Sequence, residues 1–126
     1  MRLLLDTHAL LWAVGAPAEL PPRVRALLED GSTEVCVSAA STWEISIKAA
    51  LGKLELDVGA LLATLRTLDF AELRIGFEHT RRAGALPPIH RDPFDRMLVA
   101  QALEDGYTIV TRDPAIGRYT APTLWE

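Results

Sequence analysis

The 126-residue sequence lacks the motifs that mark many enzymes and metal sites. It has one cysteine, Cys36, so no internal disulfide can form, and the absence of CxxC and HExxH motifs disfavours a zinc site. A P-loop, a glycine-rich dinucleotide turn and a Ser/His/Asp motif are also missing, which argues against the enzyme classes that depend on them. Because Cys36 lies within an apolar segment, we expect a buried, reduced thiol.

Long apolar runs and an excess of basic residues are missing too. No run approaches the roughly 18 residues of a membrane span, and Asp6 and His8 interrupt the N-terminal apolar stretch too early for a signal peptide. We therefore expect a cytoplasmic protein without a membrane partner. The formal net charge of −4 disfavours binding of nucleic acid by bulk charge alone. However, the negative charges of four particular acids, described below, add up to this net charge. Two divalent cations bound to them would neutralise it, so a nucleic-acid substrate is not excluded.

What the sequence does contain is an alternation of strand-like and helical segments. Apolar β-type runs predict strands at 2–5, 34–37 and 107–111, with further short strands at 71–75 and 124–125. Apolar spacing, prolines and glycines predict helices at 8–14, 22–30, 39–51, 58–68, 77–85 and 93–103. This order predicts one α/β domain, residues 1–126, with a parallel-type central sheet of about four to five strands flanked by helices.

Four acids stand where apolar segments end or helices begin. Asp6 follows the first strand, Glu44 lies in the helix after the second, Asp95 opens the helix at 93–103, and Asp113 follows the strand at 107–111. Ligands of open α/β sheets bind at the carboxyl ends of strands, and four carboxylates there would repel one another without a divalent cation. Mg²⁺ and Mn²⁺ prefer such oxygen ligands. We predict a metal site, with Asp6 and Asp95 as its principal ligands.

Each acid also has a structural explanation. Glu44 completes a capping-box pattern with Ser41, although Ser38 is an equally good cap for the same helix. Asp92 precedes Pro93 and is expected to cap the following helix. The other three acids stand where caps and first-turn acids are common. These explanations do not account for an acid near every strand end on one side of the sheet.

The histidines and tryptophans are weaker candidates. His8 can hydrogen-bond a site carboxylate or pack half-buried against the next helix. His79 is expected on a polar helix face and His90 in a proline-rich loop, so neither is predicted to act as a base. Trp12 and Trp43 have apolar neighbours and are expected to pack in the core or between helices.

Four motifs in order resemble those of PIN domains and, more narrowly, of VapC-type toxins from bacterial toxin–antitoxin pairs. They are Leu3-Leu4-Leu5-Asp6-Thr7-His8, Ser41-Thr42-Trp43-Glu44-Ile45, Asp92-Pro93-Phe94-Asp95-Arg96 and Thr111-Arg112-Asp113. The resemblance spans the first strand to about Asp113. It implies an endoribonuclease that uses Mg²⁺, with Mn²⁺ as a substitute, and acts on RNA. It also implies a homodimer and a cognate VapB-type antitoxin partner.

The resemblance assigns roles residue by residue. Asp6, Glu44, Asp95 and Asp113 match the catalytic, metal-binding quartet. Thr111 matches the hydroxyl residue before the last acid, and Thr7, beside Asp6, is a second supporting residue. Asp92 is additional to the general pattern.

Two surfaces are expected to contact other molecules. The basic residues nearest the acids are candidates to hold RNA phosphates, namely Lys48, Arg91, Arg96 and Arg112. Short helices carry more apolar side chains than a small core needs, which favours a dimer or antitoxin surface. These side chains are Leu10, Leu11, Trp12, Val14, Leu61, Leu62 and Leu65.

Three other functions are alternatives, and the intact set of four acids argues against one of them, a PIN fold used only for binding. A receiver-like phosphoacceptor domain has a similar length and an acidic pocket, but it pairs two acids after the first strand, whereas Thr7 follows Asp6 here. A receiver also needs an acceptor aspartate after a middle strand, and the segment 71–75 ends without an acid. A phosphatase of the haloacid dehalogenase type would need an aspartate where His8 stands. Manganese-dependent nuclease activity, compared with acyl-phosphate formation from acetyl phosphate, separates these functions.

Overall fold

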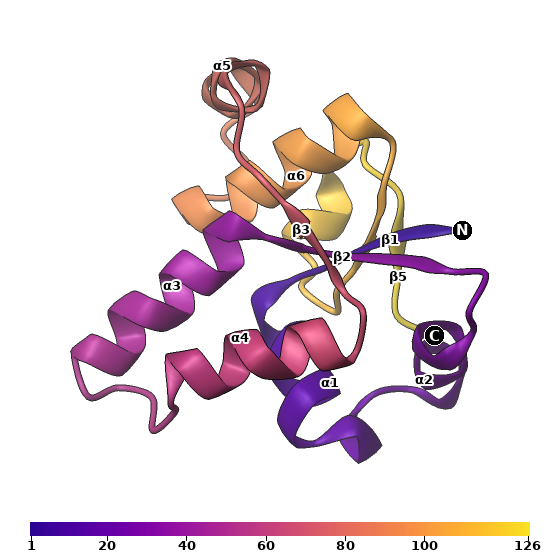
Figure 1. Ribbon diagram of the computed structural model, residues 1–126. Helices are drawn as coiled ribbons and strands as arrows, with labels where there is room; N and C mark the ends of the chain where they lie inside the picture. Colours follow the sequence, from indigo (N-terminus) through magenta and orange to yellow (C-terminus); the bar gives the residue numbers. More distant parts are fainter.

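The computed structural model describes residues 1–126, and it contains one parallel sheet covered on both faces by helices (Figure 1). The five strands lie in the order β3-β2-β1-β4-β5, and every neighbouring pair is parallel. They are β1 (Arg2–Leu5), β2 (Glu34–Ser38), β3 (Ala71–Leu73), β4 (Thr108–Val110) and β5 (Thr123–Leu124). The predicted fold class is confirmed.

Six α-helices and two short 3-10 helices connect the strands. The α-helices are α1 (Thr7–Gly15), α2 (Pro22–Glu29), α3 (Ala39–Ala50), α4 (Val58–Thr67), α5 (Phe77–Ala85) and α6 (Pro93–Asp105). The 3-10 helices, which we did not predict, are η1 (Pro17–Glu19) and η2 (Ile116–Arg118). No helix has the length and apolar character required to cross a membrane.

Alternation along the central strand divides the core into two layers. Leu3 and Leu5 point into a cluster with side chains from α1, α2, α3 and α4, while Leu4 points into a second cluster with side chains from α6 and η2. All three leucines are 0% exposed. Helix α5 packs on α6 and does not reach the sheet (Figure 1). A strand buried on both faces explains why its sequence is apolar without interruption.

The register of the strands brings their carboxyl ends to one edge. Leu5 lies opposite Val37 of β2 and Val110 of β4. The residues that follow these three are Asp6, Ser38 and Thr111, all of them buried. Polar residues at the carboxyl ends of three separate strands are therefore side by side, which is the condition that the predicted site required.

Element boundaries differ from the predictions by a few residues. Strand β3 ends at Leu73 because β2, its only neighbour, has its last paired residue at Ser38. Helix α6 continues beyond residue 103 to Asp105, where Gly106 takes a left-handed conformation with φ of 77° and ends it. Strand β5 is one residue earlier than expected, since its partners are Ile109 and Val110 of β4.

Candidate active site

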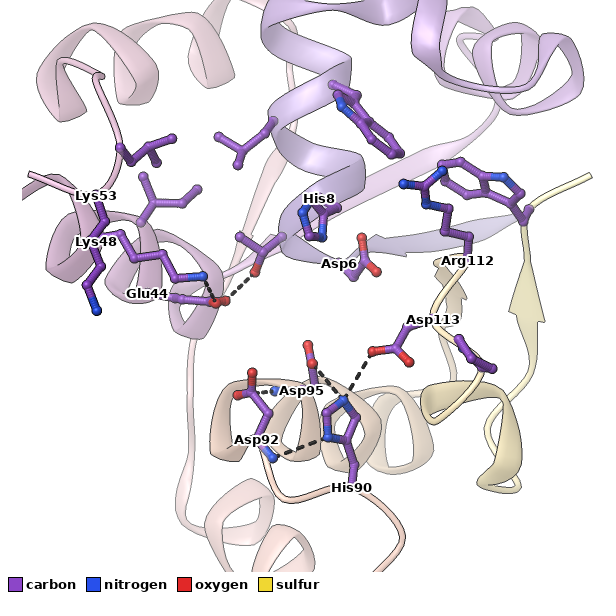
Figure 2. A pocket seen from close by; sticks show the side chains of 17 residues that line it. Asp6, His8, Glu44, Lys48, Lys53, His90, Asp92, Asp95, Arg112 and Asp113 are labelled. Atoms are coloured by element: carbon purple, nitrogen blue, oxygen red, sulfur yellow. Dashed lines mark hydrogen bonds and ion pairs between the residues drawn. The ribbon is translucent and has the colours of Figure 1, made fainter.

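A cavity of about 610 Å³ opens at the carboxyl edge of the sheet. All four predicted acids line it, and they come from four segments of the chain (Figure 2). Asp6 joins β1 to α1, Glu44 lies on α3, Asp95 on the first turn of α6, and Asp113 in the loop after β4. The expectation that these carboxylates lie together is met.

Asp6 is the N-cap of α1 and also faces the cavity. Its Oδ1 accepts a hydrogen bond from the Ala9 amide at 2.8 Å, and the residue is 7% exposed. Burial raises the pKa of the Asp6 carboxyl, and hydrogen bonds from Thr111 and Ala9 act in the opposite direction. The capping explanation for Asp6 is therefore correct and is compatible with a place in the site, because its second oxygen is not used by the cap.

Glu44 is buried and held by two neighbours. Thr7 Oγ1 donates to its Oε1 at 2.6 Å, and Lys48 Nζ lies 2.8 Å from its Oε2. The hydrogen bond to Glu44 raises the pKa of Lys48. Ser38 is the cap of α3 and accepts from the Ala40 amide at 3.0 Å, so the capping-box explanation for Glu44 is wrong.

Asp95 combines burial with unfavourable charge. Asp92 caps α6 as expected, accepting from the amides of Phe94 at 2.8 Å and of Asp95 at 3.4 Å. Burial, followed by the charge of Asp92, raises the pKa of Asp95 to about 7. Glu44 and Asp6 raise this pKa further, and His90 lowers it. A carboxyl group with this pKa is one that a cation would stabilise in its ionised form.

Asp113 is held by the loop that follows β4. Its Oδ1 accepts from the Ala115 amide at 2.8 Å, and its own amide donates to Thr111 Oγ1 at 3.0 Å. Thr111 thus contacts the backbone of Asp113 and lowers the pKa of Asp6 through a hydrogen bond.

His90 lies in the site, although we did not predict a role for it. Its Nε2 is 3.0 Å from Asp95 Oδ2 and 3.1 Å from Asp113 Oδ2 (Figure 2). His90, Asp95 and Asp113 each offer one possible metal-ligand atom, and these three atoms lie within 4.8 Å of one another. The sequence contains only a weak indication that His90 belongs to the site. It lies in a proline-rich loop, where no helical or strand periodicity indicates which way a side chain points.

The basic residues divide into two groups. Lys48 and Arg112 line the cavity, as does Lys53, which we did not predict. Arg91 is exposed and lies outside the lining.

The prediction that Arg96 holds RNA phosphates requires correction. Its guanidinium donates to the backbone carbonyls of Ala83 at 2.8 Å, Pro87 at 3.0 Å and Leu86 at 3.2 Å. These carbonyls lie at the end of α5 and in the loop after it, so Arg96 is not placed to hold RNA phosphates. A basic residue next to an acid in sequence can point elsewhere because helical neighbours face different directions.

Three aromatic predictions also require correction or refinement. His79 is buried, not on a polar face, and its Nε2 lies 2.7 Å from Asp105 Oδ2. Trp43 is 60% exposed and meets the Phe94 ring of α6 edge-on, so of the two expected places it has the one between helices and not the one in the core. Trp12 is half-buried, and the Arg112 guanidinium lies 4.6 Å from its ring centre.

The fold and site together define an α/β protein with a carboxylate centre at the carboxyl edge of a parallel sheet. A family model described as "PIN domain" matches residues 3–121, and the chain belongs to that family. Over 98% of both chains it is 27% identical to Ribonuclease VapC22 of Mycobacterium tuberculosis (strain ATCC 25618 / H37Rv). It also resembles, with a TM-score of 0.75 and 15% identity over 100% of both chains, a chain in the crystal structure of VapBC2 from Rickettsia felis bound to a DNA fragment from their promoter. At this identity the structural likeness shows the fold.

Proposed function

We propose that this protein is a Mg²⁺- or Mn²⁺-dependent endoribonuclease and the toxin of a toxin–antitoxin pair. One observation carries the proposal: four carboxylates from four segments of a PIN fold line a single cavity. The similarity to a protein named Ribonuclease VapC22 supports the choice of RNA as substrate.

The donor set fits a hard divalent cation. All four acids offer oxygen, and the raised pKa values of Asp6 and Asp95 mark carboxyl groups whose ionised forms lack compensation. Asp6, Asp95 and Asp113 would hold the ion, because Glu44 already accepts from Thr7 and pairs with Lys48. When bound, a divalent cation polarises a phosphate oxygen and lowers the pKa of a water for attack on phosphorus.

The chain's own residues bind and orient the substrate around this centre. Lys48, Lys53 and Arg112 line the same cavity and supply positive charge for the phosphates on either side of the cleaved bond. Arg112 is held against Trp12, which restricts its motion before RNA binds. Thr7 fixes one oxygen of Glu44 and thereby directs that carboxylate toward the cavity. No side chain is required to form a covalent intermediate.

Cleavage of labelled single-stranded RNA tests the proposal. The parent protein should cut RNA with Mn²⁺ or Mg²⁺ and lose cleavage with EDTA, while Asp6→Asn should be inactive although folded. Phosphorylation by acetyl phosphate without any cleavage would instead support the receiver-like alternative. Two features of the structure already disfavour that alternative, since β3 ends at Leu73 without an acid and Thr7 follows Asp6.

We further propose two protein partners, a cognate VapB-type antitoxin and a second copy of the chain. The apolar side chains that motivated this proposal are largely used by the core: Leu10, Leu61 and Leu65 are buried, and Leu62 is 37% exposed. The large apolar side chains that remain most exposed are Phe77 at 95%, Leu51 at 64% and Trp43 at 60%.

Each partner has its own test. A basic antitoxin side chain that entered the acidic cavity would compete with the metal, so co-expression with the adjacent upstream gene should yield a complex with reduced nuclease activity. Light scattering at high micromolar concentration should show twice the mass of the chain, and a strict monomer would remove the homodimer.

A further inference from the structure

His90 has contacts that the proposed function does not yet use. It lies in the loop between α5 and α6, and its Nε2 reaches one oxygen of Asp95 and one of Asp113 (Figure 2). These two carboxylates belong to a helix and to a loop 18 residues further along the chain. The Asp95 carboxylate makes no hydrogen bond within the chain, and His90 is its one ion-pair contact.

The backbone determines which nitrogen of His90 carries the proton. The Asp92 amide donates to Nδ1 at 3.2 Å. A neutral imidazole has one N–H and one acceptor nitrogen, so the acceptor is Nδ1 and the proton is on Nε2. The Nε2–H therefore donates to Asp113 Oδ2 at 3.1 Å, with Asp95 Oδ2 also 3.0 Å from the same nitrogen, and in this tautomer the nitrogen has no lone pair to offer a metal ion.

The loop that carries His90 is itself held in place. The Tyr119 hydroxyl accepts from the His90 amide at 2.9 Å and donates to the Pro87 carbonyl at 3.1 Å. Arg96 donates to the carbonyls of Pro87 at 3.0 Å and His90 at 3.4 Å. Tyr119 is buried, and the His90 side chain is 19% exposed. The position of the ring is thus set by contacts from α6 and the segment after η2.

We propose that His90 is a positioning residue whose Nε2 lies between Asp95 and Asp113, donating to Asp113 and in contact with Asp95, and so arranges both carboxylates for the divalent cation. The inference rests on the proposed metal-dependent function. Two carboxylates on separate elements each lose rotational freedom when they bind one ion, and a prior link between them reduces that loss. Groups that orient metal ligands in this way commonly change metal affinity by about 10- to 100-fold when they are removed.

His79 provides a matched control within the same chain. Its Nδ1 accepts from the Gly76 amide at 2.9 Å and its Nε2 pairs with Asp105, so it has the same kind of contacts as His90. It joins α5 to α6 and touches none of the four acids. A substitution at His79 therefore reports the loss of a structural imidazole without any change at the site.

The test compares leucine and glutamine at both histidines. Binding of Mn²⁺ to the metal-free proteins is measured by calorimetry, RNA cleavage is measured across Mn²⁺ concentrations, and thermal unfolding monitors folding. His90→Leu should weaken Mn²⁺ binding by roughly 10- to 100-fold and raise the half-saturating Mn²⁺ concentration by the same factor. Cleavage at saturating Mn²⁺ should stay within a few-fold of the parent. His90→Gln, whose amide can donate at a similar reach, should restore most of the affinity, and both His79 variants should bind Mn²⁺ like the parent.

Several results would overturn the proposal. Parent-like or tighter Mn²⁺ binding by His90→Leu would show that the imidazole does not arrange the ligands. Pulsed EPR of bound Mn²⁺ that detected a nitrogen coupling lost in His90→Gln would make His90 a ligand instead. A parent protein that binds Mn²⁺ but does not cut RNA would contradict the nuclease function alone, because the affinities would still decide the role of His90. A parent that binds no Mn²⁺ would contradict both.

Discussion

The four acids form two pairs that the protein holds in different ways. The inner pair, Asp6 and Glu44, is 7% exposed at each residue and is bound by a backbone amide, a hydroxyl and a lysine. The outer pair, Asp95 and Asp113, has side chains that are 17% and 34% exposed and share one imidazole. Within the inner pair Glu44 is paired with the charge of Lys48, whereas in the outer pair His90 donates to Asp113 and contacts Asp95.

This difference separates a preformed part of the site from a part that depends on a cation. A carboxylate paired with lysine needs no further charge to remain ionised. The Asp95 carboxylate has only the imidazole as a contact, and its burial, followed by the charge of Asp92, raises its pKa to about 7. We infer that metal binding changes the outer pair more than the inner pair, and the following substitutions test that comparison.

The largest expected effect is the loss of cleavage when a metal ligand is neutralised. Asp6→Asn should lower the rate by about 10³-fold, since a bound metal supplies several kcal/mol to the transition state. Its Oδ1 can still cap α1, so the fold should be retained. Glu44→Gln should lose less activity, because Glu44 is already engaged by Thr7 and Lys48. Single-turnover cleavage at saturating Mn²⁺ measures both, and equal losses would remove the distinction within the inner pair.

The next effect concerns the support of the outer pair. Arg96→Met should lower the free energy of unfolding by about 2–3 kcal/mol, because it leaves carbonyls of the loop after α5 without their donor. It should also weaken Mn²⁺ binding through His90. Urea unfolding and calorimetry measure the two effects, with Arg91→Met as the control on an exposed neighbour. If Arg96→Met lowered stability without any change in Mn²⁺ affinity, the loop that carries His90 would not influence metal binding.

A smaller effect is the pH dependence of stability in the metal-free protein. The folded pKa of Asp95 is about 7, above its ordinary value of 3.8, so the folded state binds this proton more tightly than the unfolded state. The free energy of unfolding should therefore fall as pH rises from about 4 to about 7. Asp95→Asn should be more stable than the parent at pH 8 by about 1–2 kcal/mol and should show a flatter profile.

Adding a divalent cation gives a second test of the pH dependence of stability. Because Mg²⁺ competes with the proton of Asp95, whose pKa is about 7, it should stabilise the parent more at pH 8 than at pH 5. Urea titrations at both pH values, with and without Mg²⁺, measure this. A parent whose stability increases from pH 5 to pH 8 without metal, in step with Asp95→Asn, would contradict the assignment.

The smallest effect distinguishes the basic residues around the two pairs. The salt dependence of RNA binding is the slope of the logarithm of the binding constant against the logarithm of the salt concentration. Arg112→Met and Lys53→Met should each reduce the magnitude of this slope by about one, whereas Arg91→Met should not change it. Fluorescence anisotropy with the Asp6→Asn background, which binds without cutting, gives the slopes. Unchanged slopes for both cavity residues would place the RNA elsewhere.

Much of the inner pair was predictable because its determinants are local. Asp6 directly follows an apolar strand and precedes a helix, and Glu44 lies on the first helix after the next strand. Parallel strands align their carboxyl ends, so the predicted order of elements was sufficient to bring these residues together. Asp95 and Asp113 were found by the same argument, although their mutual contact with His90 was not.

The predictions that were wrong concern directions, not positions. Arg96 adjoins Asp95 in the sequence but points toward α5, and His79 is buried against Asp105 instead of facing solvent. Adjacent residues of a helix face directions about 100° apart, and which direction is inside depends on the neighbouring elements.

The sequence by itself determined the alternation of strands and helices, the caps at Asp6, Ser38 and Asp92, and the set of four acids at one edge of the sheet. These follow from local periodicity, hydrogen bonding and the parallel arrangement that the alternation requires. Only the tertiary structure decided that His90 lies between Asp95 and Asp113 and that Arg96 holds a loop. Those contacts join segments whose relative position depends on how α5, α6 and the loop after β4 pack, and no local pattern in the sequence encodes that packing.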